Sequence, residues 1–339
     1  MVVYWKLGFA ESMTISLFAL SVSDFCLLVL SALVAFFHIP RLVVLSNITT
    51  YYRAVVFYFC GTVRISFNRL SLWITALISF ERCTSILLPS RVKHVLTPKK
   101  ITSAIVFLSI VFLIATIPAL VTVQTEELFD PQTNGTFFSL RYKFSLSGLH
   151  NSYFVSMCLL QFVSLIIVLI LNAVLIWALK KRNKLWVSRR TGERAAANDR
   201  TSNDASERRY RTSVFCVPLK RDAPASSAAQ RGTVCGIRAL RERKLGRMVV
   251  MLSGIHLMSS TPTLVLAFLT LVWPDLKVVS SSSGAQCFTF EFWGFITNLE
   301  ALNASVNILI YYHMSTRYRE TFKRLLASCT NRSTRVAPG

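Results

Sequence analysis

Long runs of apolar residues constrain the fold of this chain more than any other feature. A run of about 20 apolar residues is long enough to cross the hydrocarbon core of a bilayer as a helix. The 339 residues are 53% hydrophobic and their mean hydropathy is +0.49, values that are unusual for soluble domains. The sequence therefore predicts an all-α membrane protein. The predicted spans are residues 14–37, 54–80, 101–121, 153–179, 248–273 and 288–312.

The basic residues predict how these spans are oriented. The formal net charge is +22, and half of the 38 Lys and Arg residues lie between Lys180 and Arg247. Short cytoplasmic loops are enriched in Lys and Arg, so this loop and both chain ends are expected to face the cytoplasm of a multi-pass plasma-membrane protein. RNA binding is the less favoured reading of the basic loop, because it has neither interleaved aromatic residues nor a recognisable binding fold. We expect no nucleic-acid partner.

Two glycosylation sequons agree with this orientation. Asn47-Ile-Thr and Asn134-Gly-Thr fall in loops that the charge pattern assigns to the outside, where glycosylation takes place. Both asparagines are therefore candidate glycosylation sites.

The basic loop itself differs from the spans in composition. Its interior, residues 183–240, is rich in Arg, Ser and Ala and poor in apolar residues, which predicts disorder. Residues 180–182 and 241–247 are expected to extend the flanking spans as basic helices.

Polar residues recur inside the spans at helical spacing. Arg64, Ser71 and Arg82 lie close to one face of the second span, and Asp24 lies within the first. Polar groups are costly in hydrocarbon and tend to mark function, so these side chains are expected to point into the bundle. The last span carries a similar stripe formed by Glu300, Asn303, Asn307 and Tyr311.

Two strings in these spans point to one family. Glu81-Arg82-Cys83 closes the second span, and Asn303-Ala-Ser-Val-Asn307-Ile-Leu-Ile-Tyr311 closes the last one. Together they resemble the rhodopsin-like (class A) G-protein-coupled receptors, and Leu17 to Asp24 resembles the second helix of that family. The resemblance covers residues 1–328 outside the basic loop, and leaves residues 329–339 as a cytoplasmic tail. It implies a seven-transmembrane receptor bundle of which this chain holds six spans, followed by a short amphipathic helix.

The family pattern also implies a subfamily and a missing segment. The string from Ser71 to Cys83, followed by Leu88-Pro89, is similar to invertebrate peptide or chemosensory receptors. Compared with the family, the first helix is absent, which we expect to reflect a truncated N-terminus. A six-span derivative that does not signal is the alternative.

The resemblance implies roles for specific residues. Glu81, Arg82 and Glu242 match an ionic lock at the surface that engages a heterotrimeric G protein. Tyr311 matches an activation residue, and Cys329 is a palmitoylation candidate. The position that carries an aspartate in amine receptors is Arg64, which either attracts an anionic ligand group or, as we favour, pairs with Glu300. The ligand-pocket candidates are Arg64, Asn68, Ser260 and Glu300.

A sodium site is a further implication of the family pattern. Asp24, Ser71, Asn303 and Asn307 match positions that surround a sodium ion in many of these receptors. One carboxylate with neutral oxygen ligands suits a small hard cation. A hydrogen-bonded cluster with water and no ion is the alternative. We expect no other cofactor or metal.

Several positions depart from the family pattern. Ile308 replaces a proline, Ser260 replaces a tryptophan two residues before Pro262, and Ser164 takes a further proline position. The usual extracellular disulfide is impossible, and a bridge between Cys60 and Cys287 is a weaker expectation than two free thiols.

The expected function is transduction of an extracellular ligand, a neuropeptide or chemosensory cue, to a G protein. A multi-span transporter is the alternative, although no internal repeat supports it. An enzyme is not expected, because the five histidines are dispersed and no nucleophile motif is present.

Overall fold

The helices of the computed structural model match the predicted spans in position and exceed them in length. The structure describes residues 2–9, 11–37, 47–88, 96–130, 135–210, 225–272 and 283–333. Five described helices are long and apolar enough to cross a membrane. These are α2 (Ser12–Phe37), α4 (Asn47–Leu87), α6 (Pro98–Val121), α7 (Ser147–Tyr210) and α8 (Ala225–Val272). The sixth predicted span lies in α9 (Ser283–Met314), which carries Glu291 and Glu300.

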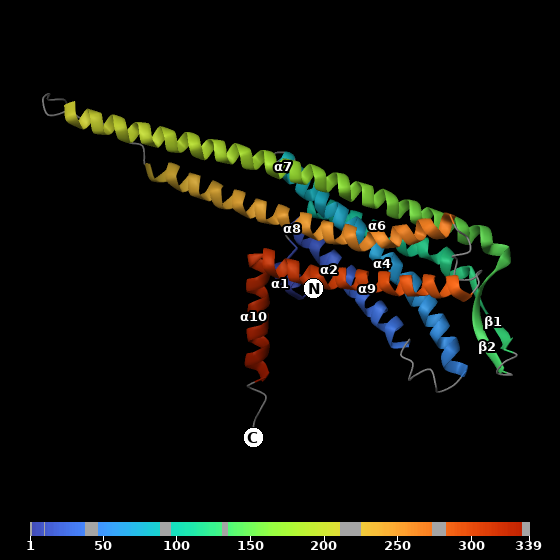
Figure 1. Ribbon diagram of the computed structural model, residues 1–339. Helices are drawn as coiled ribbons and strands as arrows, with labels where there is room; N and C mark the ends of the chain where they lie inside the picture. The colour runs from blue at the N-terminus through green and yellow to red at the C-terminus, as the bar shows by residue number, and fades with distance from the viewer. Residues whose placement is uncertain are drawn as a thin grey trace, which may run out of the picture.

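The spans lie along a common direction, and α4 occupies the middle of the bundle (Figure 1). It packs against α2, α6, α7 and α8. Its central position explains why Leu72, Ile74 and Ile78 are almost completely buried. It also explains why the least apolar of the five candidate spans is stable there, since its polar side chains face other helices instead of lipid.

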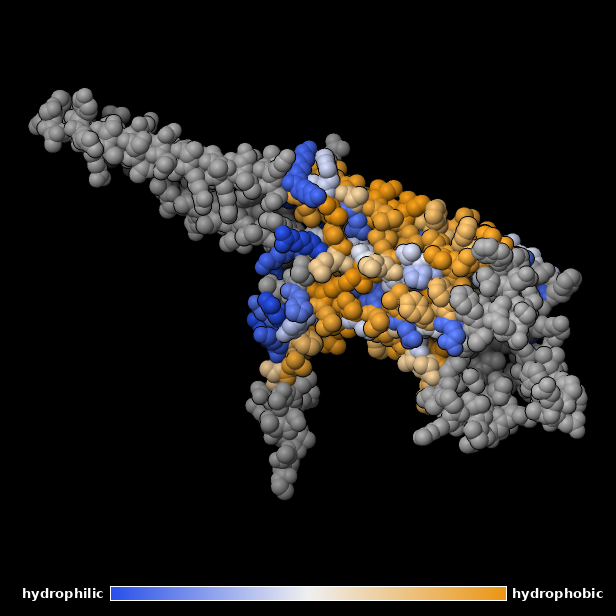
Figure 2. Space-filling model, viewed as in Figure 1, coloured by the Kyte–Doolittle hydropathy of each residue, from blue (hydrophilic) through white to orange (hydrophobic). Residues whose placement is uncertain are grey.

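The outer surface of the bundle is apolar. Figure 2 shows a hydrophobic band over the helices and hydrophilic side chains at the end where α10 (Thr316–Ser333) begins. Phe107 on α6 and Leu159 on α7 are exposed, whereas Asp24 and Asn307 are buried. This inverted distribution is what a hydrocarbon solvent requires, because lipid cannot hydrogen-bond polar groups. It supports the predicted membrane-spanning arrangement.

The first residues of the chain pack at the hydrophilic end of the bundle. α1 (Val2–Leu7) places the buried Tyr4 against Tyr311 and Tyr318, with ring centroids 5.8 and 5.2 Å apart. Gly8, at φ 77°, makes the turn into α2, a backbone conformation that favours glycine. Partial burial raises the pKa of the Tyr318 phenol, which lies on α10 outside the membrane-spanning helices. That phenol therefore stays neutral at physiological pH.

The loop after α6 contains a β-hairpin that the span pattern did not predict. β1 (Val123–Asp130) pairs antiparallel with β2 (Gly135–Tyr142), from Val123 opposite Tyr142 to Asp130 opposite Gly135. A short 3-10 helix, Phe144–Leu146, joins it to α7. The available signal was the Asn134-Gly135 pair, because this dipeptide favours tight hairpin turns.

The helices in the basic loop and at the C-terminal end of the chain are longer than the sequence predicts. The basic segments 180–182 and 241–247 extend α7 and α8, as expected, but helix also covers much of the interval 183–240 that composition predicts to be disordered. Helix α10 likewise continues beyond residue 328 and ends at Ser333. Cys329 is thus part of this helix and does not follow it. The helical propensity of Ala, Arg, Lys and Glu explains both extensions.

Candidate functional site

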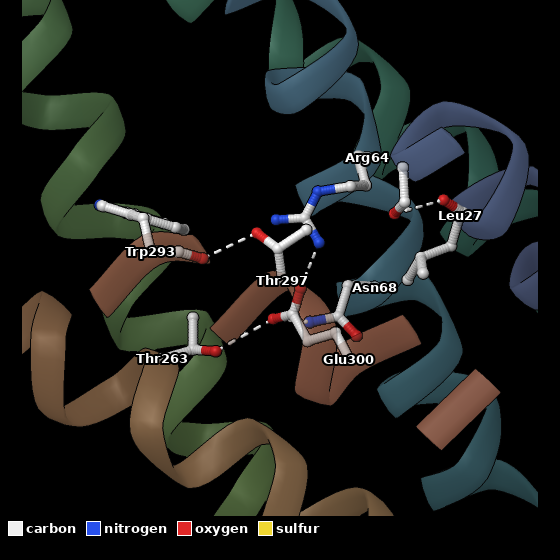
Figure 3. Close-up of polar contacts among 8 residues, drawn as sticks. Leu27, Arg64, Asn68, Thr263, Trp293, Thr297 and Glu300 are labelled. Carbon is white, nitrogen blue, oxygen red and sulfur yellow. Dashed lines mark hydrogen bonds and ion pairs between the residues drawn. The ribbon is translucent and has the colours of Figure 1, made fainter. Parts of the chain in front are cut away.

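Glu300 lies at the centre of a buried polar cluster that joins three helices (Figure 3). From α4, Arg64 Nη1 donates to Glu300 Oε2 at 2.6 Å and Asn68 Nδ2 donates to Oε1 at 2.6 Å. From α8, Thr263 Oγ1 donates to the same Oε1 at 3.0 Å. The Glu300 carboxylate thus fastens α9 to both α4 and α8.

Burial makes this cluster energetically important. Arg64 is 3% exposed and Glu300 is 2% exposed, so water does not screen the ion pair. Removing one partner of a buried pair is strongly destabilising, because the other charge remains without compensation. The internal pair that the sequence favours is therefore present. The whole cluster contains three of the four ligand-pocket candidates, namely Arg64, Asn68 and Glu300.

A second cluster forms around Asp24, nearer the predicted cytoplasmic side. Ser71 Oγ of α4 donates to Asp24 Oδ1 at 2.9 Å, and Asn307 Nδ2 of α9 donates to Asp24 Oδ2 at 2.7 Å. All three residues are buried. The carboxylate of α2 is thus held by α4 and α9, two of the three helices that form the Glu300 cluster.

Asn303 lies outside the Asp24 cluster, although the family resemblance groups it there. Its Nδ2 lies 3.1 Å from Nδ1 of the buried His256 on α8. Sequence reasoning missed His256, which was counted only among dispersed histidines. Its position four residues before Ser260, on the same side of the helix, was the available signal.

Several buried polar atoms on α8 and α9 have no hydrogen-bond partner among the described residues. Such atoms normally bind ordered water or an ion, because an unsatisfied buried polar group is costly. Two of them are side-chain amide oxygens, a type of atom that is a suitable ligand for a hard cation, and one of these belongs to Asn307, which contacts Asp24. The atoms are Ser260 Oγ, His256 Nε2, Asn303 Oδ1, Asn307 Oδ1 and Tyr311 Oη.

At the predicted cytoplasmic end of α4, two of the predicted lock residues, Glu81 and Arg82, contact α2. Glu81 is 3% exposed and its Oε2 accepts a hydrogen bond from Ser16 Oγ at 3.1 Å. The half-buried Arg82 directs Nη2 to the sulfur of Met13. The side chain of Glu242, the third predicted member, lies outside the described residues.

Two polar features of α7 were not predicted. Ser253 Oγ on α8 donates to Asn172 Oδ1 on α7 at 2.6 Å, which ties these helices within the apolar layer. Arg69 on α4 has a buried Nη1 without a partner among the described residues, and its charge acts on Cys158 of α7. The span stripes did not indicate either feature, because both depend on how α7 is rotated.

The modification candidates are only partly described. Asn47 begins α4, but its side chain lies outside the described residues. The same holds for the whole of Asn134 and for the side chains of Cys287 and Cys329. Cys60 is a free thiol in the structure. Within the described residues, no group of three His, Cys, Asp or Glu side chains is placed to hold a metal ion.

Comparison with known proteins places the chain in a family. Residues 1–311 match the family model described as 7 transmembrane receptor (rhodopsin family). No curated protein matches the chain. The family is one of non-enzymatic signalling receptors, and the apolar helices agree with a multi-pass protein of the plasma membrane. The match covers the helices that carry both buried clusters, and the chain therefore belongs to the rhodopsin family of seven-transmembrane G-protein-coupled receptors.

Proposed function

We propose that this receptor detects an extracellular neuropeptide or chemosensory cue and activates a heterotrimeric G protein through its cytoplasmic end. The observation that supports this proposal best is the polar stripe on α4. Arg64 contacts α9, Ser71 contacts α2, and Glu81 contacts α2 at the cytoplasmic end. Helix α4 thus carries polar contacts near the end proposed to receive the ligand and also near the end proposed to bind the G protein.

The helix contacts suggest which elements a ligand would shift. A ligand changes a conformational equilibrium only by its difference in affinity for the two states. Thr263 and Ser253 fasten α8 to α9 and α7, respectively, and Pro262 lies within α8 beside Thr263. A ligand that perturbs the Glu300 cluster would therefore act directly on α8.

Ser260 and Ile308 bear on how such a shift is transmitted. Residue 260 is serine, so no aromatic ring at this position can transmit the shift of α8. Residue 308 is isoleucine, so α9 has no proline kink there. We infer that rearranged hydrogen bonds around His256 and Asn303 take over this connection between α8 and α9.

At the cytoplasmic end, we propose that Arg82 binds the G protein when it leaves its resting contacts. Glu81 and Glu242 are the carboxylates assigned to restrain it. Their attraction is stronger at a partly buried site than in water, although desolvation offsets part of the gain. Weakening this restraint would favour the active state without a ligand.

We also propose that sodium stabilises the resting bundle at Asp24. The donor set fits this cation, because the carboxylate is accompanied by the hydroxyl of Ser71 and by the amide oxygen of Asn307, which has no partner among the described residues. The ion would supply positive charge to the buried carboxylate. A hydrated cluster without an ion is the competing proposal.

Formation of a nucleotide-free complex tests the receptor function directly. The full chain in lipid nanodiscs is mixed with a panel of purified heterotrimers, and bound nucleotide is removed enzymatically. We expect one heterotrimer to co-elute with the chain and to dissociate when a non-hydrolysable GTP analogue is added. Arg82→Ala should prevent co-elution, whereas Arg317→Ala, which removes an exposed arginine at the same end, should not. Absence of a complex with every heterotrimer would refute the proposal.

A further inference from the structure

A hollow of about 300 Å³ lies between α2, α4 and α6. Its walls are apolar and include Phe18 of α2, Ile74 of α4 and Ile105 of α6. Two further wall residues on α6, Val106 and Leu113, are exposed. The hollow therefore opens onto the apolar surface of the bundle, which a bilayer covers.

Small side chains make room for this hollow. They come from all three helices and are Ala19, Ser23, Ser66 and Ser109. Ser23 Oγ donates to the carbonyl oxygen of Phe67 at 2.9 Å, and Ser109 Oγ donates to a carbonyl oxygen of its own helix at 2.8 Å. Ser66 Oγ shares a hydrogen bond with Thr116 Oγ1. The hydroxyl protons of the walls are thus used inside the protein, and an occupant meets mainly hydrocarbon.

The volume of the hollow limits what can enter it. One turn of an α-helix with its side chains is about 10 Å across and about 5.4 Å long, roughly 400 Å³, so a partner helix does not fit. A hydrocarbon chain is narrower, and the bilayer supplies such chains at this depth. The wall residues of α6 extend from Thr102 to Leu113, a rise of about 16 Å along the helix axis. The hollow is thus elongated, as an acyl chain requires.

A basic residue lies at one end of the hollow. Thr102 is the wall residue nearest the start of α6, and Lys99 precedes it by three residues on the same side of the helix. Lys99 is exposed and forms no ion pair with the described carboxylates. Helix α6 begins on the predicted cytoplasmic side, where α4 ends. A lysine at such a position reaches the level of the lipid headgroups.

We propose that the hollow holds one acyl chain of an acidic phospholipid of the cytoplasmic leaflet, whose headgroup pairs with Lys99. This inference goes beyond the proposed function and does not depend on it. A sterol hydroxyl is neutral and a zwitterionic headgroup has no net charge, so neither gains as much from a nearby cation. The attraction of one basic residue for an acidic leaflet corresponds to about fivefold in affinity.

Filling the hollow should stabilise the helices around Asp24. Ser23, the residue before Asp24, ties α2 to α4 through the carbonyl oxygen of Phe67. A chain in the hollow contacts α2, α4 and α6 together. Because it binds the folded bundle, it raises the unfolding temperature by mass action.

Native mass spectrometry of the purified full chain in detergent measures this binding without a G protein. The probes are phosphatidylserine and phosphatidylcholine with identical acyl chains, together with cholesterol. We expect the first phosphatidylserine to bind about fivefold more tightly than the first phosphatidylcholine. Cholesterol should not displace it.

Two variants and their matched controls locate the lipid. Lys99→Gln should abolish the preference for phosphatidylserine, whereas Lys181→Gln, which removes an exposed lysine of α7 at the same membrane face, should retain it. Ser109→Phe fills the hollow and should weaken binding of the first lipid at least about tenfold, since the chain loses its apolar contacts. Ser305→Phe should bind as the wild type does. It makes the same substitution at an exposed serine of α9 whose hydroxyl also bonds to the carbonyl oxygen four residues earlier.

Three results would overturn the inference: equal affinity for the two phospholipids, an unchanged preference in Lys99→Gln, or wild-type binding by folded Ser109→Phe. Displacement of phosphatidylserine by cholesterol would assign the hollow to a sterol and overturn it as well. If Ser109→Phe does not fold, the comparison of Lys99→Gln with Lys181→Gln still decides the outcome. None of these measurements involves nucleotide exchange, so the inference and the proposed function fail or stand separately.

Discussion

Replacing Arg64 and replacing Glu300 should destabilise the folded protein by different amounts. Removal of one partner from a buried ion pair costs about 3–5 kcal/mol. After Arg64→Met, the Glu300 carboxylate keeps its hydrogen bonds from Asn68 and Thr263. After Glu300→Leu, Arg64 loses its partner, and the donors of Asn68 and Thr263 lose their acceptor as well. Each buried donor left unsatisfied costs about 1–3 kcal/mol more. Glu300→Leu is therefore the more damaging change.

The double variant provides the decisive comparison. Arg64→Met with Glu300→Leu removes both charges and leaves one fully buried neutral donor, Asn68, unsatisfied, because Thr263 is partly exposed. It should therefore lose about 1–3 kcal/mol and be more stable than either single variant. Thermal unfolding in detergent, together with surface expression, measures this series. Arg64→Met alone should lower the unfolding temperature by about 6–20 °C, at about 2–4 °C per kcal/mol.

An exposed ion pair serves as the matched control. Arg317 Nη1 lies 3.1 Å from Glu11 Oε1, and these side chains are 59% and 56% exposed. Solvent screening limits such a pair to about 0–1 kcal/mol, so Arg317→Ala should shift unfolding very little. If the destabilisation of the double variant equals the sum of the two single variants, Arg64 and Glu300 do not act as a pair and the reasoning is refuted.

Three further predictions concern the other clusters and the modification sites. Replacing potassium by sodium at equal ionic strength should raise the unfolding temperature of the wild-type chain but not of Asp24→Asn; equal stabilisation of both would exclude a sodium site at this carboxylate. Glu242→Ala should increase basal nucleotide exchange on the G protein, since it removes a restraint on Arg82, and unchanged exchange would argue against the proposed lock. Asn134→Gln and Asn47→Gln should each remove one glycosidase-sensitive step in electrophoretic mobility from the protein produced in cells; a mobility that neither variant changes would place both asparagines outside the reach of glycosylation.

The helical stripes could be predicted because they follow from the geometry of single helices. At 3.6 residues per turn, Arg64 and Ser71 must lie near one face of α4, and Glu300 and Asn307 near one face of α9. Since lipid excludes polar groups, both faces had to turn inward. The Arg64–Glu300 pair agrees with these two constraints, whereas the grouping of Asp24 with Asn307 came from the family resemblance.

The depth and rotation of one helix relative to another could not be obtained in this way. Asn303 and Asn307 share a stripe but lie about 6 Å apart along the helix axis, at 1.5 Å per residue. Only Asn307 is bonded to Asp24, and Asn303 meets His256 instead. The contact between Asn172 and Ser253 was missed for the same reason. The hairpin of β1 and β2 was missed because hydropathy marks spans and carries little information about short strands between them.

Nucleotide exchange on a purified heterotrimer tests the central claim, that the polar stripe on α4 belongs to a G-protein-activating receptor, most directly. The full chain in lipid nanodiscs is added to the heterotrimer with which it forms a complex, and the rate of GTP-analogue uptake is compared with that of the heterotrimer alone. We predict that the wild-type chain increases the rate and that Arg82→Ala loses this increase while retaining its unfolding temperature. A wild-type rate equal to that of the heterotrimer alone, or an unchanged rate with Arg82→Ala, would contradict it.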